Sequence, residues 1–327
     1  MLVLVTGASG FIGANVARSF LEHGYQVRAL IRKQSNTIAL QGTSIELAHG
    51  DLLDRESVAR ALEGCQALVH CAALYTFWSR DPAPIYEANV GGTRLVLEEA
   101  MKAGVGKCVY TSTVSTIHAP GDRLGAEDDW PAEEEMVGHY KRSKYRAEVE
   151  ACRINNQGFP VVVVNPTAPV GPWDVKPTPT GRIVLDFIRR RVPVCIDTGM
   201  NVVDVEDVAH GHVLALEKGT PGERYILGNA NLSLRQMFEM LEDVSGVPAP
   251  RWNLPMWVAV GAAHVDNFIE GSLMRREPAI PLEGLNVARK PVYVNCDKAS
   301  QELGMPQSSV AQALEKAVGW FRAHSYA

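Results

Sequence analysis

The apolar residues of the first 166 positions form short runs that alternate with longer segments of mixed polarity. The runs have the length and the β-branched content of buried strands, and the segments between them have the length of helices. Strands are predicted at 2–5, 26–31, 45–49, 67–71, 107–111 and 161–164, and helices at 11–22, 54–62, 85–103 and 137–156. This alternation predicts an α/β fold with a doubly wound parallel sheet.

The pattern changes after residue 166. A proline-rich loop covers 170–181, and one more strand is predicted at 202–205. Helices are predicted at 182–190, at 208–217 behind Asp207, at 235–244 behind Ser233, and at 254–269 and 310–323. We therefore expect residues 1–170 to form the sheet domain, with 200–228 returning to it. Residues 171–199 and 229–327 are expected to form a smaller, mostly helical domain.

Three glycines, Gly7, Gly10 and Gly13, separate the first strand from the first helix. Such a turn lets the backbone approach a ligand, and N–H groups at the helix N-terminus can face a pyrophosphate. Glycine spacing alone also fits ordinary turn chemistry, but a second strand follows the helix at the distance of a βαβ unit. We therefore expect a dinucleotide-binding domain of the Rossmann type. The residues expected at the cofactor are Gly7, Ser9, Gly10, Phe11, Ile12 and Gly13.

The residues after the second strand bear on which nicotinamide dinucleotide is bound. An NAD enzyme usually has an acidic residue here, which binds the 2′-hydroxyl of the adenosine ribose. No Asp or Glu occurs between Gly24 and Ile45, whereas Arg28, Arg32 and Lys33 are present. Because guanidinium matches the geometry of phosphate, the segment favours the 2′-phosphate of NADP(H). A solvated basic turn is the alternative.

The ends of the third and fourth strands carry further candidates. Asp51 and Leu52 leave the third strand, and Asp51 either accepts a hydrogen bond from the adenine amino group or belongs to the turn. Ala72 and Ala73 leave the fourth strand and are small enough for a cofactor to lie against them. Aromatic residues follow at the edge where open α/β sheets bind ligands, and they either line a substrate pocket or pack against the fold. They are Tyr75, Phe77 and Trp78.

Composition excludes several classes of function. The 327 residues are 46% apolar and 21% charged with a net charge of -5, which argues against nucleic acid or an anionic membrane as a partner. A strand that starts at residue 2 leaves no room for a signal peptide, and no apolar run approaches the ~18 residues of a membrane span. The six cysteines include no Cys-x-x-Cys pair, so a cytoplasmic location is expected. His210 and His212 lack a third ligand, so no metal site is expected.

A tyrosine and a lysine on the helix at 137–156 can supply acid/base chemistry. Tyr140 and Lys144 lie four residues apart, hence on one face, and Thr113 lies at the carboxyl end of the fifth strand. Lowering the pKa of a phenol from about 10 to neutrality takes roughly 4 kcal/mol. One cation at ~4 Å supplies about that much at an effective dielectric of ~20. A surface tyrosine beside a solvated lysine is the alternative, and the glycine turn, Asn89 and the Thr113 hydroxyl argue against it.

Together these residues resemble an extended short-chain dehydrogenase/reductase over essentially the whole chain. Residues 6–13 stand at the family's glycine motif, and its Asn, Ser/Thr, Tyr, Lys tetrad falls on Asn89, Thr113, Tyr140 and Lys144. The resemblance implies hydride transfer between a nicotinamide and a carbonyl or carbinol carbon, with Tyr140 as general acid/base. It also implies that Lys144 holds the nicotinamide ribose and Thr113 orients the carbonyl oxygen. Asn89 would position a water or the catalytic helix.

The resemblance also bears on the remaining cofactor contacts and on the architecture. Thr111, Pro166 and Thr167 lie at the ends of strands where the family binds its cofactor. A C-terminal substrate domain is implied, and often a homodimer built on a four-helix bundle. Residues 177–182 and 204–209 most resemble the dihydroflavonol 4-reductase-like branch, in particular hopanoid-associated sugar epimerases.

The substrate side leaves alternatives open. Epimerases of the family commonly carry an arginine before the strand at 202–205, where it grips a nucleotide diphosphate, and Met200 stands at that position here. Trp173 and the aromatics after the fourth strand predict an apolar pocket, which favours reduction of an aldehyde or ketone. A nucleotide-sugar epimerase or dehydratase with a recycled cofactor is the alternative, with Arg182, Arg189 or Arg289 at the phosphates. A non-catalytic NADP-sensing protein is the alternative of another class.

Overall fold

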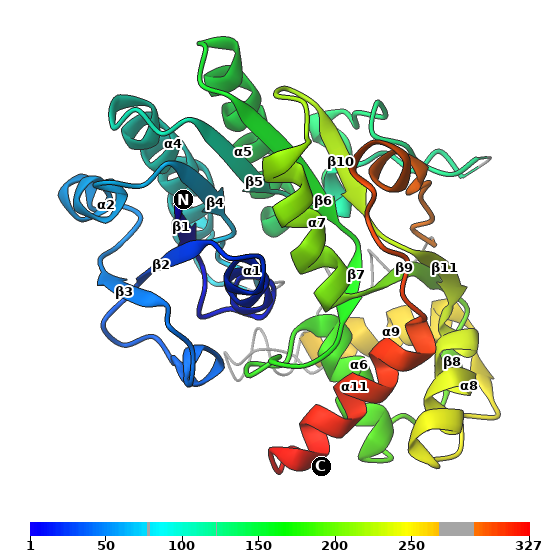
Figure 1. The fold of residues 1–327 in the computed structure, drawn as a ribbon. Helices are drawn as coiled ribbons and strands as arrows, with labels where there is room; N and C mark the ends of the chain where they lie inside the picture. The colour runs from blue at the N-terminus through cyan, green and yellow to red at the C-terminus, as the bar shows by residue number, and fades with distance from the viewer. Residues whose placement is uncertain (77–78, 122, 268–290) are drawn as a thin grey trace.

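The computed structural model describes residues 1–76, 79–121, 123–267 and 291–327. A seven-stranded parallel sheet forms its main layer, with the strand order β10-β6-β5-β4-β1-β2-β3 (Figure 1). This arrangement confirms the predicted doubly wound α/β fold. The strands are β1 (Leu2–Thr6), β2 (Gln26–Ile31), β3 (Glu46–His49), β4 (Ala67–His70), β5 (Lys107–Thr111), β6 (Val161–Pro166) and β10 (Arg224–Leu227).

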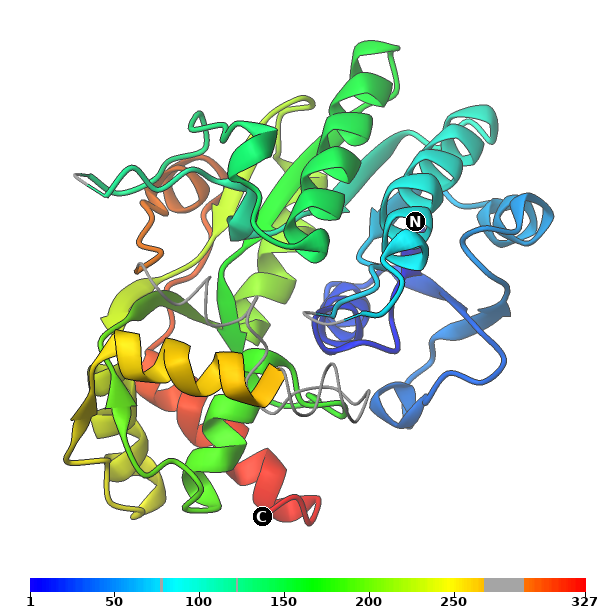
Figure 2. The ribbon, with the colours of Figure 1, turned by 180° about the vertical axis from the view of Figure 1, so that it is seen from behind.

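Helices cover both faces of this sheet. On one face α1 (Phe11–Glu22) packs against α7 (Val205–Glu217). On the other, α4 (Gly92–Lys102) packs between α2 (Arg55–Leu62) and α5 (His139–Asn156), as the view from behind shows (Figure 2). The strands contribute alternate apolar side chains to the two layers, so each face has its own buried core.

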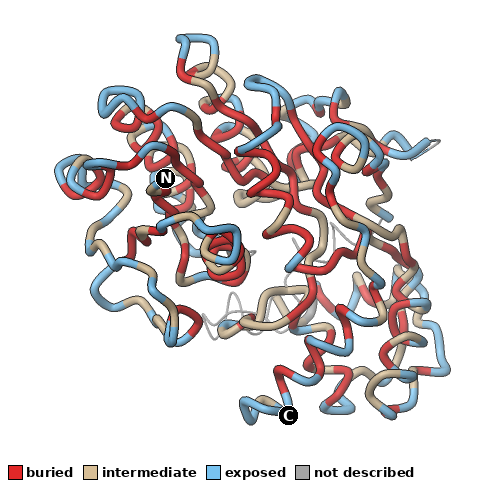
Figure 3. Tube along the Cα trace, viewed as in Figure 1, coloured by how far each residue is buried: buried red, intermediate tan, exposed pale blue. Residues whose placement is uncertain are grey.

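A second group of elements, of which part precedes and part follows β10 in the chain, surrounds a core of its own. Its largest buried side chains include Phe187, Phe238 and Phe321, and its helices alternate buried with exposed positions (Figure 3). The strands are β7 (Ala168–Val170), β8 (Cys195–Ile196), β9 (Gly199–Asp204), β11 (Ala230–Ser233) and β12 (Asn253–Leu254). The helices are α6 (Pro179–Ile188), α8 (Leu234–Ser245), α9 (Met256–Asp266) and α11 (Val310–Ala323).

Several predicted elements are confirmed residue for residue, namely the strands at 26–31 and 107–111 and the helices at 11–22 and 310–323. Two helix caps also agree, because the side chains of Asp54 and Ser233 accept hydrogen bonds from the first turns of α2 and α8. No strand was predicted at the positions of β7, β8, β10, β11 and β12. The division into two domains stays a prediction, although β10 places part of the returning segment in the main sheet.

Some predicted boundaries are wrong for identifiable reasons. The helix at 85–103 is divided into α3 (Ala83–Tyr86), a π-helical turn (Glu87–Gly91) and α4, because the buried Asn89 bonds outside the helix. Helix α7 begins three residues early, since Asp204, and not Asp207, caps it by accepting from the N–H of Glu206. Asp207 instead accepts from Ser308.

The strand predicted at 202–205 also begins earlier, at Gly199, because residues 199–202 pair with β11. In the segment predicted as a helix at 254–269, β12 comes first and α9 begins at Met256; residues from 268 on lie outside the described part. Within the described residues, no helix has the length and apolar character that a membrane crossing would require.

The last helix offers a test of local stability. Gly319 lies exposed inside α11, and no atom lies within 4 Å of the position that a Cβ would take. We expect Gly319→Ala to raise the free energy of unfolding by roughly 0.5–1 kcal/mol, because alanine loses less backbone freedom in a helix. Urea unfolding measures the change. In the control Gly211→Ala, within α7, the new methyl would lie 3.0 Å from Leu227 and should give no such gain.

Candidate active site

The glycine turn between β1 and α1 is closed by backbone contacts. Gly7 has a φ of +72°, and a Cβ there would lie 2.7 Å from the backbone of Ala72. A Cβ on Gly13 would lie 2.2 Å from the carbonyl oxygen of Gly7, which also accepts a hydrogen bond from the N–H of Gly10 at 2.9 Å. No side chain caps α1, so its first N–H groups can serve an anion. These observations fit the pyrophosphate of a dinucleotide.

A chain of buried hydrogen bonds fixes the end of β4 beside this turn. The N–H of Ala72 donates to the hydroxyl of Thr6 at 3.2 Å, and that hydroxyl lies 2.7 Å from Nδ1 of His70. Nε2 of His70 lies 3.0 Å from the hydroxyl of Thr93 on α4. Burial lowers the pKa of His70 to about 3, so the imidazole is neutral and serves as a connector. The small residues Ala72 and Ala73 follow as predicted.

Of the residues predicted to bind the adenosine half of the cofactor, some already have protein partners. Arg28 is bound to Glu46 at 2.8 Å and to the carbonyls of Ala61 and Glu63, so it is structural and does not serve a phosphate. Arg32 and Lys33 are exposed and have no side-chain partner within the described part of the chain. They therefore remain the candidates for a 2′-phosphate.

Asp51 is also exposed at the carboxyl end of β3, and Leu52 follows it. Oδ1 of Asp51 accepts from the N–H of Leu53 at 3.0 Å, as turn chemistry requires. Leu52 lies against Gly92, where a Cβ would approach its side chain to 3.3 Å. That close approach accounts for a glycine at the start of α4. Both Asp51 and Leu52 stay predictions as cofactor contacts.

Lys144 is buried at the carboxyl edge of β5. Its side chain, in a residue only 3% exposed, donates to the hydroxyl of Tyr110 and to the carbonyl of Thr111, both at 2.9 Å. Burial lowers the pKa of Lys144 to about 8, while the carboxylate of Glu148 opposes the shift. An ammonium that titrates this close to neutrality, at a sheet edge, is typical of a catalytic site.

Tyr140 lies one turn before Lys144, and its ring centre is 4.4 Å from that of Tyr75. Burial raises the pKa of Tyr140 above its usual value, and the lysine is directed to β5. The lowering of the tyrosine pKa by Lys144 stays a prediction. Without it the phenol is protonated at neutral pH, as an ordinary phenol is.

Asn89 joins the loop after β4 to the helix that carries Tyr140. Its side-chain oxygen accepts from the N–H of Leu74 at 2.6 Å, and its nitrogen donates to the carbonyl of Leu74 and to the hydroxyl of Ser143. Ser143 in turn donates to the carbonyl of Tyr140 at 2.7 Å. The π-helical turn around Asn89 is the kind of helix irregularity that accompanies functional sites.

Thr113 follows β5 and opens a short 3₁₀ turn at 114–116. Its hydroxyl oxygen accepts from the N–H of Ser115 at 3.2 Å, which leaves the hydroxyl proton available for a ligand. The hydroxyl oxygen of Thr111 lies 2.9 Å from Nε2 of the buried His212, so the Thr111 side chain already has a partner within the protein. Pro166 ends β6, and the N–H of Thr167 donates to β10.

The substrate candidates are dispersed. Tyr75 lies at Tyr140, whereas Phe77 and Trp78 lie outside the described residues. Met200 is part of β9, opposite Leu232, and packs partly into the second core. Their substrate roles stay predictions.

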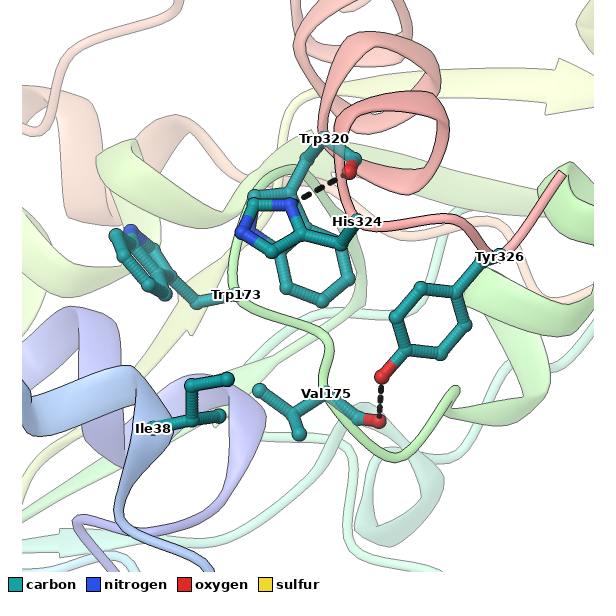
Figure 4. A pocket seen from close by; sticks show the side chains of 6 residues that line it. All are labelled: Ile38, Trp173, Val175, Trp320, His324 and Tyr326. Atoms are coloured by element: carbon teal, nitrogen blue, oxygen red, sulfur yellow. Dashed lines mark hydrogen bonds between the residues drawn. The ribbon is translucent and has the colours of Figure 1, made fainter.

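Trp173 is directed towards α1 and α11. Its ring centre lies 4.0 Å from the guanidinium of Arg18, and its backbone has a φ of +71°, which is unusual for a tryptophan. Figure 4 shows it at the wall of a cavity of about 160 Å³, with Trp320 and His324 of the C-terminal segment opposite. The remaining lining residues are Ile38, Val175 and Tyr326.

Five polar residues that sequence reasoning missed lie directly behind the site. Glu148 could have been noticed, because it follows Lys144 by four residues on the same face of the helix. The others meet only in the folded chain and carry no local signal. They are Ser112, Thr116, Asn165 and Arg224. The predicted absence of a metal site stays a prediction, and among the described residues no group of three ligand side chains is close enough to hold an ion.

Comparison with known proteins assigns the family. The NAD dependent epimerase/dehydratase family matches residues 3–228. A "Putative dihydroflavonol 4-reductase" of Synechocystis is 45% identical over 98% of this chain and 95% of its own. "Sterol demethylase protein B" of Methylococcus capsulatus is 35% identical over 98% of both chains. The crystal structure of gox2253 is 40% identical and covers 99% of both chains with a TM-score of 0.88.

The chain therefore belongs to the NAD dependent epimerase/dehydratase family, the extended short-chain dehydrogenases/reductases. It is an NAD(P)-dependent oxidoreductase, as the resemblance implied.

The glycine turn supplies a direct test of the cofactor site. We expect Gly13→Ala to weaken NADPH binding at least tenfold, or by about 1.4 kcal/mol, because the methyl group would force the turn away from Gly7. Fluorescence titration with NADPH measures the affinity. Gly319→Ala, the same substitution far from the turn, should bind as the wild type does. Unchanged binding by Gly13→Ala would contradict the assignment of the turn.

Proposed function

We propose that the protein is an NADPH-dependent reductase that converts an aldehyde or ketone into an alcohol. The observation that carries the proposal is the position of Tyr140 one helical turn from the buried Lys144, at the end of β5 and beside the glycine turn. This is the edge of an open α/β sheet where ligands bind. All four members of the predicted tetrad are present, which argues against a non-catalytic sensor.

The proposed mechanism divides the work among these residues. Bound NADPH supplies a hydride to the carbonyl carbon. Tyr140, whose phenol is protonated at neutral pH, gives its proton to the carbonyl oxygen. The Thr113 hydroxyl donates a hydrogen bond to the same oxygen and so orients the substrate. Lys144 holds the nicotinamide ribose, and Asn89 keeps the helix of Tyr140 in place through Ser143.

Several features support an apolar substrate over a nucleotide sugar. Tyr75 lies against Tyr140, and Met200 stands where an epimerase would carry its phosphate-binding arginine. Arg189 donates to the carbonyl of Tyr326, so this candidate for a diphosphate is already engaged. The relatives named for dihydroflavonol reduction and sterol demethylation point to ring-containing apolar compounds. Epimerisation remains the second candidate because of the family. Of the arginines proposed for its phosphates, Arg289 lies outside the described residues, and Arg182 remains available.

We also propose a cytoplasmic protein that forms a homodimer. All six cysteines are free thiols, which suits a reducing compartment. Met101 on α4 and Val149 on α5 are exposed apolar side chains on neighbouring helices, as a helical interface needs.

Cofactor preference follows from the basic turn after β2. We expect NADPH to bind more tightly than NADH, and Arg32→Gln to weaken NADPH binding while leaving NADH binding nearly unchanged, because only NADPH has a 2′-phosphate. Titration of both cofactors measures this. Arg60→Gln, which removes an exposed arginine of α2, is the matched control. Equal or tighter binding of NADH by the wild type would remove the argument from Arg32 and Lys33.

The reaction itself is tested with two substrate panels. Aromatic and aliphatic aldehydes and ketones are followed by NADPH absorbance, and nucleotide sugars are analysed for epimers. We expect NADPH oxidation with members of the first panel, because the ring of Tyr75 lies beside the proposed proton donor Tyr140. Epimer formation without net consumption of cofactor would replace the reductase by the epimerase.

Tyr140→Phe is the control for the chemistry. It removes the proton donor and little else, so it should abolish turnover while NADPH binds almost as tightly as before. Retention of most of the activity would mean that another acid protonates the substrate. A wild-type protein that is inert toward both panels would favour an NADP sensor.

A further inference from the structure

One buried carboxylate at the site has no part in the proposed chemistry. Glu148 lies one turn after Lys144 on α5 and is fully buried. Its Oε1 forms an ion pair at 2.7 Å with Nε of Arg224, whose side chain is 5% exposed. Neither of these two atoms has a hydrogen bond of acceptable geometry, so the contact is purely ionic. The guanidinium of Arg224 also donates hydrogen bonds to the carbonyls of Glu127 and Thr116, each at 2.7 Å.

The other oxygen of Glu148 holds the turn that carries Thr113. Oε2 accepts hydrogen bonds from the hydroxyls of Ser112 and Thr116, the latter at 2.6 Å. These two residues lie on either side of Thr113 in the chain. Asn165 ties the same groups together, because its amide donates to Oε2 at 3.3 Å and to the carbonyl of Thr113 at 3.2 Å. The backbone of Thr113 is thus fixed from β6 and α5, while its hydroxyl proton stays available.

We propose that Glu148 is a positioning residue: anchored by Arg224, it fixes the turn at 112–116 and so determines where the Thr113 hydroxyl meets the substrate. The inference rests on the proposed function, which assigns that hydroxyl to the carbonyl oxygen. Misplacement of a reacting group by about 1 Å costs on the order of 10²-fold in rate, so a turn held this firmly matters to the chemistry. Through Glu148, the edge strand β10 acts on a site to which it contributes no reacting group.

Glu148 also acts on Lys144 through its charge. On β5 the lysine donates to the carbonyl of Thr111 and to the phenol of Tyr110, and burial keeps that phenol protonated. His70 and Cys71 face it from the end of β4, and burial leaves both of them uncharged at neutral pH. Tyr140 is likewise protonated. Among these groups Glu148 supplies the negative charge that keeps the ammonium protonated.

The test compares two identical substitutions on one helix. Glu148→Gln keeps the shape of the side chain and removes its charge, and Glu150→Gln does the same two residues later, where the carboxylate pairs with Arg94 and Arg153 near the surface. With NADPH and the best carbonyl substrate of the panel, we expect kcat of Glu148→Gln to fall on the order of 10²-fold, with NADPH affinity retained. Glu150→Gln should behave as the wild type.

The pH profile separates a positioning role from a loss of packing. Without the carboxylate, the ammonium of Lys144 is less favoured and loses its proton at lower pH. The alkaline limb of the rate profile should therefore move to lower pH in Glu148→Gln and stay in place in Glu150→Gln. A defect in packing alone would lower the rate without this shift.

A double-mutant cycle tests the route through Thr113. If Glu148 acts by placing the hydroxyl, Glu148→Gln should lower kcat much less in a Thr113→Val background than in the wild type.

Ser112→Ala is the second variant, because it releases one contact of the turn and leaves the ion pair intact. It should lower kcat with little change in thermal unfolding, and it decides the matter alone if Glu148→Gln does not fold.

The outcomes distinguish the inference from the proposed function. Additive losses in the cycle, wild-type kinetics in Glu148→Gln, or wild-type kcat in Ser112→Ala would overturn the role of Glu148 and leave the reductase standing. A wild-type protein that reduces no carbonyl of the panel would remove the reductase instead.

Discussion

The site depends on keeping one ammonium group, that of Lys144, out of water at the carboxyl edge of the sheet. Taking such an ion out of water costs several kcal/mol, which nearby dipoles and charges must offset. The ammonium donates hydrogen bonds to the hydroxyl of Tyr110 and to the carbonyl of Thr111, and the carboxylate of Glu148 supplies the opposite charge. The offset is incomplete, because the pKa of Lys144 still falls to about 8. Strand β5 and helix α5 must therefore keep one fixed register.

Buried polar contacts extend this requirement through the sheet domain. One chain runs from Thr6 at the glycine turn through His70 to Thr93 on α4, and another runs from Glu148 to Arg224 on β10. Removing one partner of a buried ion pair costs about 3–5 kcal/mol, because the other charge is left unpaired. The return of the chain to the sheet at β10 is thus coupled to the active site. The segment between β6 and β10 adds β7, α6, β8 and β9 to the second group of elements, and the rest of that group follows β10.

The sequence predicted those parts whose signal is local. The glycine turn, the spacing of Tyr140 and Lys144 and the alternation of strands with helices all depend on neighbouring residues. Arg28 shows where this reasoning ends: it looked like a phosphate ligand, but it lies opposite Glu46 in the β2–β3 register and is neutralised there. Arg224 carried no local signal because its partner comes from α5. The cap is Asp204 and not Asp207 because β9 pairs with β7 as far as Asp204, where the strand ends.

The electrostatics of the site couple the proton that Tyr140 transfers to the charge of the cofactor. Burial disfavours the phenolate of Tyr140, which is both the product of proton donation and the base that oxidation would need. Proton transfer in either direction therefore needs a positive charge near the phenol oxygen. Lys144 carries one such charge, and its ammonium is held by β5. An oxidised nicotinamide would add a second, so hydride transfer to the substrate would favour release of the tyrosine proton, and the same charge would favour the phenolate as a base in the reverse reaction.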